Sequence, residues 1–482
     1  MLYLLTVLFP MIAGPAVCVR PDKREAAQNR RYAVIMLVSD ILGVFSILYG
    51  KPVTLFHMTQ KAEMALALDD FGRITLTAVM LLYTAVCFYA FEYMKMEEHV
   101  PVFFGFYFIS LGALMAVCMS CNLVTLYFCF ELATLSTVPL ALHERTKEAI
   151  AAGLKYLFYS IAGALMGLLA VFFVYYYSSG NGQFVMGGFL DPARLAGHEG
   201  VFLAVMFVGI LGFGTKAGMY PMHGWLPTAH PIAPAPASAL LSGIIAKAGI
   251  IAIVRLVYYS TGAQLLRGTW LQKAWMILAM VTILMGSTCA FREKVMKKRL
   301  AFSTVSQISY IMLGLSMLSE EGLKGGILHL LSHAASKGCL FLVAGIFIYK
   351  LGKRNVSELR GVGKQMPVTM WCFMIASLSL VGIPPMGGFT SKWVLAGAAI
   401  GNGMGIFAVL TPVVLLISAL LTAGYLFPIA IDAFFPGQDF DDTGLKKCEP
   451  SWFMTIPLMV LCLGALIVGV FGTGILNLLT LF

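Results

Sequence analysis

Charged residues are scarce in this sequence of 482 residues, since only 12% are Asp, Glu, Lys or Arg, against 59% that are hydrophobic. A soluble globular protein has an apolar fraction of about 45 to 50%, so the composition excludes a soluble fold. The sequence also lacks a glycine-rich nucleotide-binding fingerprint, a cysteine set for an iron–sulfur cluster and a polar stretch long enough for a soluble domain. These absences disfavour a redox enzyme that works by itself.

A succession of long apolar stretches takes the place of the missing polar segments. Each crossing of a bilayer needs about 20 apolar residues, and about fourteen such stretches follow one another with short connections. We therefore expect an all-α polytopic membrane protein. The expected spans are 2–19, 31–50, 72–91, 101–119, 122–141, 150–177, 201–222, 238–258, 271–290, 300–318, 326–349, 368–397, 403–431 and 452–480.

The net charge of +10 would suggest a nucleic-acid partner in a soluble protein, but here the basic residues gather in alternate loops. Cytoplasmic loops of membrane proteins are rich in Lys and Arg, and the first span has such a cluster only after it. We expect a protein of the inner (plasma) membrane of a prokaryote, with its N-terminus outside and no nucleic-acid partner. The basic loops are 20–31, 142–149, 291–299, 350–364 and 446–447.

The most unusual stretch runs from residue 212 to residue 247, where two apolar runs, the first of which begins at Val201, carry lysines. The first run ends at Lys216 and is broken by Gly218 and Pro221, and the second run holds Lys247. An ionisable group at bilayer depth costs about 2.5 to 3.5 kcal/mol on insertion scales. Buried lysines beside helix breakers therefore indicate an ion or proton path rather than a membrane anchor.

A second interrupted stretch lies in the twelfth expected span. Gly382, Pro384 and Pro385 break an apolar run, and Lys392 follows the break. Because the two breaks are five spans apart, the broken spans have opposite orientations, and the order of breaker and lysine is reversed between them. Paired interruptions of this kind are typical of inverted repeats with a site near the middle of the membrane.

Glu131 is a lone carboxylate well inside the fifth expected span. Burial disfavours its charged form, so it either takes up a proton or meets a cation from another helix. Lys216 is the candidate cation, and a change in their separation would switch Lys216 between holding and releasing a proton. Two simpler interpretations remain: a lipid-edge Glu131 without a role, and a permanent ion pair that only fixes helix packing.

The eleventh expected span carries His329, His333 and Lys337 at i, i+4 and i+8, a spacing that puts all three on one helix face. Histidine titrates near neutral pH and exchanges a proton at either ring nitrogen. We therefore predict a proton relay that continues the line from Lys247 and ends at Lys392. The alternatives are satisfied core histidines and a metal pair, although the glutamate of the HExxH motif is missing.

Other ionisable or reactive residues have more ordinary interpretations. His223 and His230 flank the first break and either form a proton inlet or hold the loop. Arg255 lies close to a span end, where solvated charge is ordinary. Cys118 and Cys121 form a lone CxxC pair, for which apolar packing competes with a disulfide or redox role. A zinc or iron–sulfur site would need more ligands.

These residues also make the chain resemble a known family. The sequence is similar to the proton-conducting, antiporter-like membrane subunits shared by respiratory complex I, Mrp multisubunit cation antiporters and membrane-bound energy-converting hydrogenases, and the Mrp and hydrogenase-type branch is favoured. The matching motifs follow the family order between residues 70 and 430. They are Phe130-Glu131-Leu, Lys216, His223-Gly-Trp-Leu-Pro-Thr-Ala-His230-Pro, Lys247, His333-Ala-Ala-Ser-Lys337 and Gly382-Ile-Pro-Pro-Met-Gly-Gly-Phe-Thr-Ser-Lys392.

The resemblance implies about fourteen membrane-spanning helices, two inverted five-helix repeats and broken seventh and twelfth helices. It divides the chain into an N-terminal three-helix segment (1–100), a first repeat (101–258), a second repeat (271–431) and a C-terminal helix (452–482). It also implies a central polar axis that needs no cofactor and no metal. The residues of this axis are Glu131, Lys216, Lys247, His329, His333, Lys337 and Lys392.

The implied function is proton translocation by an antiporter-like membrane subunit of a multisubunit redox-driven complex, either an energy-converting hydrogenase or a complex I-like oxidoreductase. Such a subunit has no catalytic redox site of its own and works beside other membrane subunits in the lipid bilayer. The alternative is a subunit of an Mrp-type antiporter, which exchanges Na⁺ for H⁺ without electron transfer.

Overall fold

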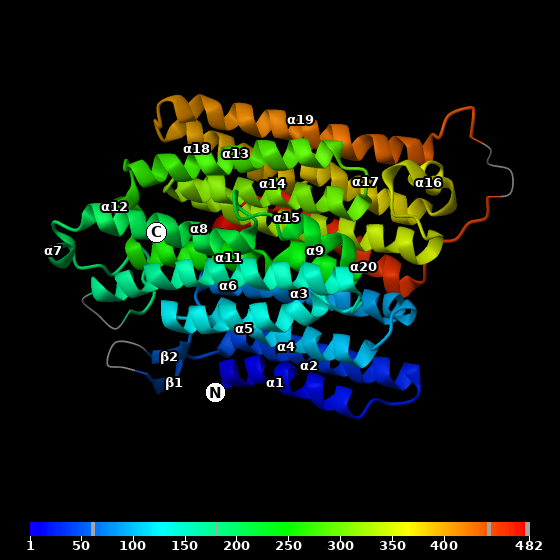
Figure 1. Cartoon of the computed structure of the whole chain (residues 1–482), viewed down its shortest axis with the longest axis horizontal. Helices are drawn as coiled ribbons and strands as arrows, with labels where there is room; N and C mark the ends of the chain where they lie inside the picture. The colour runs from blue at the N-terminus through cyan, green and yellow to red at the C-terminus, as the bar shows by residue number, and fades with distance from the viewer. Residues whose placement is uncertain (59–62, 179–181, 441–444, 478–482) are drawn as a thin grey trace.

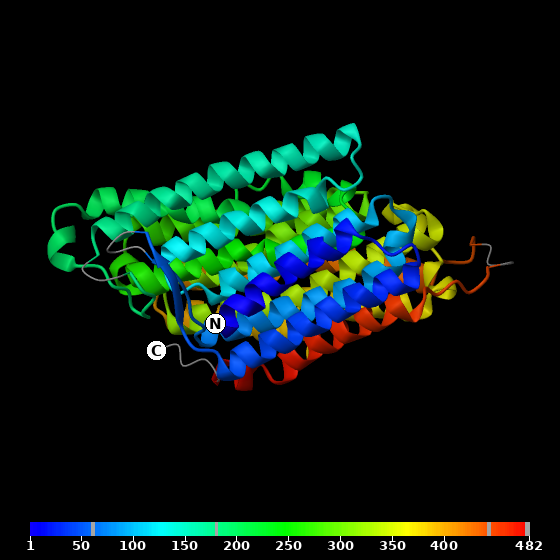
Figure 2. The same ribbon diagram turned by 90° about the horizontal axis from the view of Figure 1, so that it is seen from below.

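The computed structural model describes residues 1–58, 63–178, 182–440 and 445–477. Its long helices run side by side along one direction and form a bundle (Figures 1 and 2). Twelve helices of the described residues are long and apolar enough to cross a membrane. The chain is therefore a multi-pass membrane protein, and its fold is all-α apart from one short hairpin.

The N-terminal part of the bundle contains six long helices. Three of them have a side-chain N-cap: Asp69 caps α3, Asn122 caps α5 and Thr146 caps α6. The six helices are α1 (Leu2–Val19), α2 (Glu25–Tyr49), α3 (Asp70–Tyr93), α4 (Val100–Met119), α5 (Leu123–Ala141) and α6 (Lys147–Tyr176).

The hairpin lies between α2 and α3 and was not expected from the sequence. Its strands β1 (Val53–His57) and β2 (Glu63–Leu66) are antiparallel, with Val53 opposite Leu66. The Asn122 side chain at the start of α5 donates a hydrogen bond of 2.9 Å to the Glu63 carbonyl. The hairpin thus packs on one end of the bundle, at the start of α5 (Figure 1).

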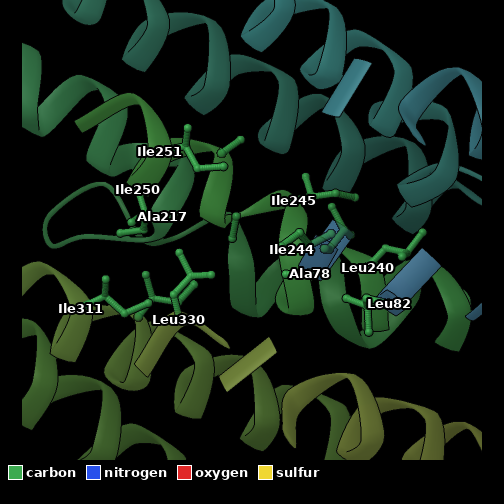
Figure 3. Packing of buried hydrophobic residues seen from close by; sticks show 14 of the residues in the cluster. Ala78, Leu82, Ala217, Leu240, Ile244, Ile245, Ile250, Ile251, Ile311 and Leu330 are labelled. Carbon is green, nitrogen blue, oxygen red and sulfur yellow. The ribbon is translucent and has the colours of Figure 1, made fainter. Parts of the chain in front are cut away.

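The centre of the bundle is the segment from Ala235 to Thr261, which is buried along its whole length. It is a composite helix in which two π-helical stretches, η2 and η3, interrupt the α-helix, and π-bulges are frequent at functional sites. Ile244 lies there near Ala78 and Leu82 of α3, and Ile251 lies further along the segment within the same hydrophobic cluster (Figure 3). The parts of this segment are α10 (Ala235–Leu240), η2 (Leu241–Ile245), α11 (Lys247–Val254) and η3 (Arg255–Thr261), and α8 (Glu199–Ala217) and α9 (Leu226–Ile232) precede it.

Most helices of the C-terminal half lie on the side of this central segment opposite α1 and α2 (Figure 1). The helices of this half are α13 (Trp270–Arg292), α14 (Met296–Ser316), α15 (Glu320–Leu351), α17 (Pro367–Val381), α18 (Gly387–Gly401), α19 (Ile406–Phe434), α20 (Trp452–Val470) and α21 (Gly472–Asn477). Short helices lie in the connections: η1 (Met94–Met96), α7 (Pro192–Leu195), α12 (Ala263–Leu266), η4 (Val356–Leu359) and α16 (Val362–Gln365).

The sequence predicts about fourteen spans. Twelve of them correspond to the twelve long apolar helices, and the other two do not. The stretch 300–318 forms α14, which is long enough to cross but begins with three basic residues and is rich in hydroxyl groups. The stretch 368–397 is split into α17 and α18, of 15 residues each. The predicted end of the seventh stretch at residue 222 was also wrong, because α8 already ends at Ala217.

Both interruptions have a glycine in the left-handed region. Gly218 follows α8 with φ of +79°, and Gly382 follows α17 with φ of +92°. A residue with a Cβ rarely adopts these angles, so glycine is the usual residue at such a helix end. The glycines therefore define where each helix stops, and the lysines lie directly beside the two stops.

Candidate functional site

Lys216 lies in the last turn of α8 and is 1% exposed. Its Nζ donates a hydrogen bond of 2.5 Å to Thr134 Oγ1 on α5. The same Nζ lies 5.1 Å from the ring centroid of Phe130 and 5.5 Å from that of Tyr156, a distance at which the ring face attracts a cation. The helix end is held by Trp225, whose indole N–H donates to the Thr215 carbonyl at 2.8 Å.

Glu131 lies on α5, one turn before Thr134, and is partly buried. The charges of Glu131 and Lys216 interact, but none of the ion pairs of the described residues joins them. Oε1 of Glu131 is buried and has no hydrogen-bond partner there. The structure therefore brings Glu131 and Lys216 close together. The lysine donates its hydrogen bond to the hydroxyl of Thr134, however, and not to the carboxylate.

Lys247 is fully buried and follows the π-helical stretch η2 directly. Its Nζ donates a hydrogen bond to the carbonyl of Ser242, which lies inside that stretch. The Ser242 hydroxyl is 2.7 Å from Thr304 Oγ1 on α14. A π-helical turn redirects side chains and carbonyls that a regular α-helix would align, and here it places an ammonium group against a backbone oxygen in the middle of the bundle.

The predicted stripe on α15 is present, and all three of its residues are buried. Nδ1 of His329 is 2.9 Å from Ser391 Oγ on α18, and the His329 and His333 rings stack with centroids 6.1 Å apart. Lys337 donates to the Leu300 carbonyl on α14 at 3.0 Å. Among the described residues, both ring nitrogens of His333 and Nε2 of His329 have no hydrogen-bond partner.

Lys392 lies on α18 just after the second break and is partly buried. Its Nζ donates to two carbonyls at the end of α17, those of Leu380 at 2.6 Å and Val381 at 2.9 Å. It also lies 5.0 Å from the ring centroid of Tyr310, which stacks on His329 at 5.1 Å. One tyrosine ring therefore lies between the end of the histidine stripe and this lysine.

The predicted residues form two groups. Lys247, His333 and Lys337 lie near enough to influence one another electrostatically, as do His329 and Lys392. Because the rings of His329 and His333 also stack, these five residues lie in one neighbourhood. Glu131 and Lys216 form a second pair on α5 and α8. The two groups meet where α11 packs on α8: a Cβ at Gly249, two residues after Lys247, would lie 3.2 Å from Lys216 Cβ.

Two further histidines from the sequence pattern lie near this line. His230 is fully buried on α9 and stacks on Phe341 of α15 at 4.6 Å. Neither of its ring nitrogens has a hydrogen-bond partner in the part of the chain that the structure describes. His223 lies in the first break and stacks on Tyr220 at 5.8 Å. His230 therefore faces α15 from inside the bundle rather than merely holding a surface loop.

The interpretation of Arg255 as an ordinary solvated charge was wrong. Arg255 is 2% exposed, lies in the π-helical stretch η3, and makes two hydrogen bonds of 2.6 Å to the carboxylate of Asp69. The rings of Phe184 and Tyr259 lie 4.9 and 4.4 Å from the guanidinium. Burial raises the pKa of Asp69, but the charge and hydrogen bonds of Arg255 outweigh it, so the pKa lies below its usual value.

The sequence analysis missed two ionisable residues. Asp40 lies inside α2, and its carboxylate accepts a hydrogen bond of 2.6 Å from Thr84 Oγ1. Lys297 was counted with a basic loop, yet it is 5% exposed and donates to the Ala233 carbonyl at 2.9 Å. The available signal for Asp40 was its position as the single acid within the apolar run of the second span.

Cysteine and histidine chemistry was the remaining question from the sequence. Cys118 and Cys121 are free thiols, and Cys121 Sγ donates to the Ala65 carbonyl at 3.2 Å. Within the described ranges, no group of three or more His, Cys, Asp or Glu side chains is arranged to hold a metal ion. His329 and His333 therefore lack a third ligand in that part of the chain.

Comparison with solved structures shows the fold. The chain is similar to a subunit in the structure of the membrane-bound sulfane sulfur reductase, an archaeal respiratory membrane complex, with a TM-score of 0.83 and 22% identity over 99% of this chain and 96% of that one. It is also similar to a subunit of the Mrp complex from Dietzia sp. DQ12-45-1b, with a TM-score of 0.79 and 22% identity over the same shares.

Sequence comparison shows the family. The chain is 33% identical over 386 residues to NADH-quinone oxidoreductase subunit N of Desulforudis audaxviator, covering 78% of this chain and 75% of that protein. It is 34% identical to hydrogenase-4 component B of Escherichia coli over 69% of this chain, which spans half of that relative's length. Residues 120–421 match the family described as "NADH:quinone oxidoreductase/Mrp antiporter, TM". The chain thus belongs to the family of antiporter-like membrane subunits found in complex I, Mrp antiporters and hydrogenases.

Proposed function

We propose that this chain translocates protons as a subunit of a multisubunit, redox-driven membrane complex, either an energy-converting hydrogenase or a complex I-like oxidoreductase. The observation that carries the proposal is the line of buried ionisable groups inside the bundle. Lys216, Lys247 and Lys337 are each at most 1% exposed, and none forms an ion pair within the described part of the chain. Ionisable groups kept at such depth without ion pairing are characteristic of proton and ion pathways.

Glu131 and Lys216 form the switch of the proposed pathway. Lys216 is held by a neutral hydroxyl, and Glu131 lies close enough for their charges to interact. An approach of the carboxylate favours the ammonium form of the lysine, and its withdrawal favours release of the proton, because desolvation alone disfavours the charge. A movement of α5 against α8 would thus convert a conformational change in the complex into proton transfer.

Lys247, the α15 stripe and Lys392 form the continuing path. Buried nitrogens without a protein partner are unusual in folded proteins, and here they gather on His230, His329 and His333. Neutral imidazole binds a proton at one nitrogen and releases one from the other, so these rings suit a relay. The path then passes Tyr310 and reaches Lys392 beside the second break.

The proposed architecture is two inverted five-helix repeats within fourteen crossings, with α8 and α17–α18 as the broken seventh and twelfth helices. The repeats are residues 101–258 and 271–431, between the three-helix segment 1–100 and the C-terminal helix in 452–482. The two Gly-terminated helix ends beside lysines support this division. Alternate loops rich in Lys and Arg support an N-terminus outside a prokaryotic plasma membrane.

A subunit of an Mrp-type Na⁺/H⁺ antiporter is the second candidate. The fold of the Mrp complex subunit supports it as much as the fold of the sulfane sulfur reductase subunit supports redox drive. In the antiporter, the same axis would exchange H⁺ for Na⁺ without electron transfer. In both cases the partners are other membrane subunits, which supply the movement that drives Glu131 and Lys216.

Proton transport by the assembled complex in sealed vesicles tests the proposal. At a fixed external pH, we expect substrate-driven acidification of the vesicle interior. Its rate should not change with Na⁺ concentration, and it should be lost in Lys216→Ala. Transport that requires Na⁺ and continues without an electron donor would instead favour the antiporter. Acidification that is unchanged in Lys216→Ala and in Glu131→Ala would contradict the proposed pathway.

A further inference from the structure

Asp40 is an ionisable residue that the proposed pathway does not use. It lies in the middle third of α2, and one carboxylate oxygen accepts the hydrogen bond of Thr84. The other oxygen, Oδ1, is buried, and within the described ranges it has no hydrogen-bond partner and Asp40 takes part in no ion pair. A carboxylate at membrane depth without a cation is costly, so such a residue is a functional candidate by default.

A group of buried hydroxyls lies directly behind Asp40. Asp40 lies near enough to Tyr107 to influence its hydroxyl electrostatically, and the Tyr107 hydroxyl donates to the carbonyl of Tyr83. The Tyr83 hydroxyl is 2.9 Å from Ser110 Oγ, and the two tyrosine rings pack edge to face at 5.0 Å. Both tyrosines are fully buried, so this group continues from the edge of the bundle into its interior.

A second group of hydroxyls connects this region to Lys216. Tyr83 and Tyr156 interact electrostatically, and the Tyr156 hydroxyl is 2.8 Å from Thr137 Oγ1. Thr137 lies one turn after Thr134, the hydrogen-bond partner of Lys216. The side chains of Tyr156, Thr137 and Thr134 are all fully buried. Hydroxyl groups from α3, α4, α6 and α5 therefore form a row between Asp40 and the lysine.

We propose that Asp40 is an additional proton-binding residue, joined to Lys216 by this row of buried hydroxyls. The inference rests on the proposed proton pathway and adds a lateral branch to it, from α2 to α8. Asp40 takes up and releases a proton at its carboxylate, and the hydroxyls of Tyr107, Tyr83 and Tyr156 pass it by exchanging hydrogen-bond donors. Four joints of the row have no direct hydrogen bond between the two side chains: Asp40 to Tyr107, Tyr107 to Tyr83, Tyr83 to Tyr156 and Thr137 to Thr134. The hydroxyls of Tyr107 and Thr137 donate to the backbone carbonyls of Tyr83 and Thr134 instead. At these joints, rotation of a hydroxyl or one water molecule completes the contact.

A purely structural role is the competing explanation, because the bond from Thr84 to Asp40 also ties α2 to α3. Asp40→Asn separates the two roles: asparagine keeps an oxygen that accepts the Thr84 hydrogen bond, but it cannot bind and release a proton. Tyr156→Phe interrupts the row while keeping the ring that faces Lys216. Tyr89→Phe is the matched control, since Tyr89 is a fully buried tyrosine whose hydroxyl bonds the Leu342 carbonyl outside the row.

The experiment compares proton transport by the assembled complex carrying each variant, with Lys216→Arg as the reference for the main pathway. We expect Asp40→Asn and Tyr156→Phe to slow transport at least fivefold and Tyr89→Phe to leave it unchanged. If Asp40→Asn transports at the normal rate while Lys216→Arg does not, the branch is overturned and the main pathway stands. Normal transport by Lys216→Arg would overturn the pathway itself.

Chemical labelling of the unmodified complex adds a measurement that does not depend on assembly of a variant. Dicyclohexylcarbodiimide is an apolar reagent that modifies protonated carboxyl groups in apolar surroundings. We expect mass spectrometry to find its adduct on the peptide that contains Asp40, and infrared difference spectra during turnover to contain a carboxyl band that Asp40→Asn removes. Absence of the adduct, or of a band assignable to Asp40, would overturn the proposal.

Discussion

The two broken helices hold their lysines in different ways. Lys216 precedes its break, is almost fully buried and donates to a side-chain hydroxyl near the carboxylate of Glu131. Lys392 follows its break, is partly buried and donates to the backbone carbonyls of Leu380 and Val381. Both ammonium groups lie about 5 Å from an aromatic ring. The difference is therefore in the hydrogen-bond acceptors and not in the aromatic contact.

Because of this difference, the electrostatic partner of Lys216 can change, whereas the partner of Lys392 is fixed. The C-terminal end of a helix carries a partial negative charge of roughly half an elementary charge, which stays in place as long as the helix does. The charge of Glu131 is a full unit and can be neutralised by a proton or withdrawn by a helix movement. Under the proposed function, Lys216 is thus the lysine whose protonation is regulated, and Lys392 is the lysine at the end of the pathway, with partners that do not change.

The largest effect is expected from Lys216→Arg. Arginine keeps the positive charge and a donor to Thr134, but it does not deprotonate in proteins. A residue that cannot release its proton cannot take part in a relay, and loss of such a proton-transfer group lowers a rate by about a hundredfold or more. We expect proton transport in vesicles to fall by that factor, while the complex assembles normally.

Lys155→Arg is the matched control for this exchange. Lys155 is a lysine of α6 on the bundle surface, and its Nζ donates to Thr228 at 3.0 Å. The substitution changes the same functional group without touching the buried line, so transport should stay at the normal rate. Equal losses in both variants would mean that the geometry of the guanidinium, and not proton release, is responsible.

The next effect in size is expected from Glu131→Gln, which removes the switchable charge but keeps the side-chain shape. Of the two lysines beside the breaks, Lys216 is the one with the Glu131 carboxylate nearby. Without that charge, the surroundings of Lys216 should resemble those of Lys392. A coupling of about 2 kcal/mol between the two groups would reduce transport about thirtyfold. Glu148→Gln, an exposed glutamate at the start of α6, should have no effect on the same measurement.

Much of this comparison was accessible from the sequence. Long apolar runs define the spans, because a membrane helix must satisfy its backbone internally and be apolar outside. Gly218 and Gly382 mark the breaks, since a helix end in the left-handed region calls for glycine. Once the breaks are placed, the sequence also gives the positions of both lysines relative to them. The location of these lysines could therefore be predicted from the sequence.

The partners of these residues could not be predicted in the same way. Arg255 pairs with Asp69, which lies 186 positions earlier in the chain, and only the packing of η3 against the start of α3 brings them together. The acceptor of Lys216 is a threonine on another helix, one of many hydroxyls that the sequence contains. Periodicity identifies which face of a helix is polar, whereas the contact between two faces depends on how the helices pack.

Tighter packing at the first break predicts a smaller but measurable difference in stability. Both Gly218→Ala and Gly382→Ala force alanine into the left-handed region, at about 1 to 2 kcal/mol each. A Cβ at Gly218 would also meet Leu226 Cδ1 at 2.2 Å, whereas at Gly382 the nearest atom is Lys392 Cδ at 3.1 Å. The unfolding temperature of the purified protein in detergent should therefore be lowered more by Gly218→Ala than by Gly382→Ala.

Gly397→Ala is the reference for these glycine exchanges. Gly397 lies within α18, and a Cβ there would meet no atom within 4 Å. Alanine in a helix is favoured over glycine by about 1 kcal/mol, so this variant should unfold at a slightly higher temperature. If Gly382→Ala destabilises more than Gly218→Ala, the second break is the tighter one and the comparison is reversed.

The smallest effect is expected from Thr134→Val, which tests the hydroxyl acceptor alone. Valine keeps the shape of threonine but removes the hydrogen bond to Lys216, a loss of about 1 kcal/mol or about fivefold in a rate that depends on it. Lys392 is not open to such a change, because its acceptors belong to the backbone. Thr77→Val, which removes an exposed hydroxyl bonded only to its own helix at the Arg73 carbonyl, should leave transport unchanged. If the two valine variants transport equally well, the hydroxyl only fills space, and Glu131 alone distinguishes Lys216 from Lys392.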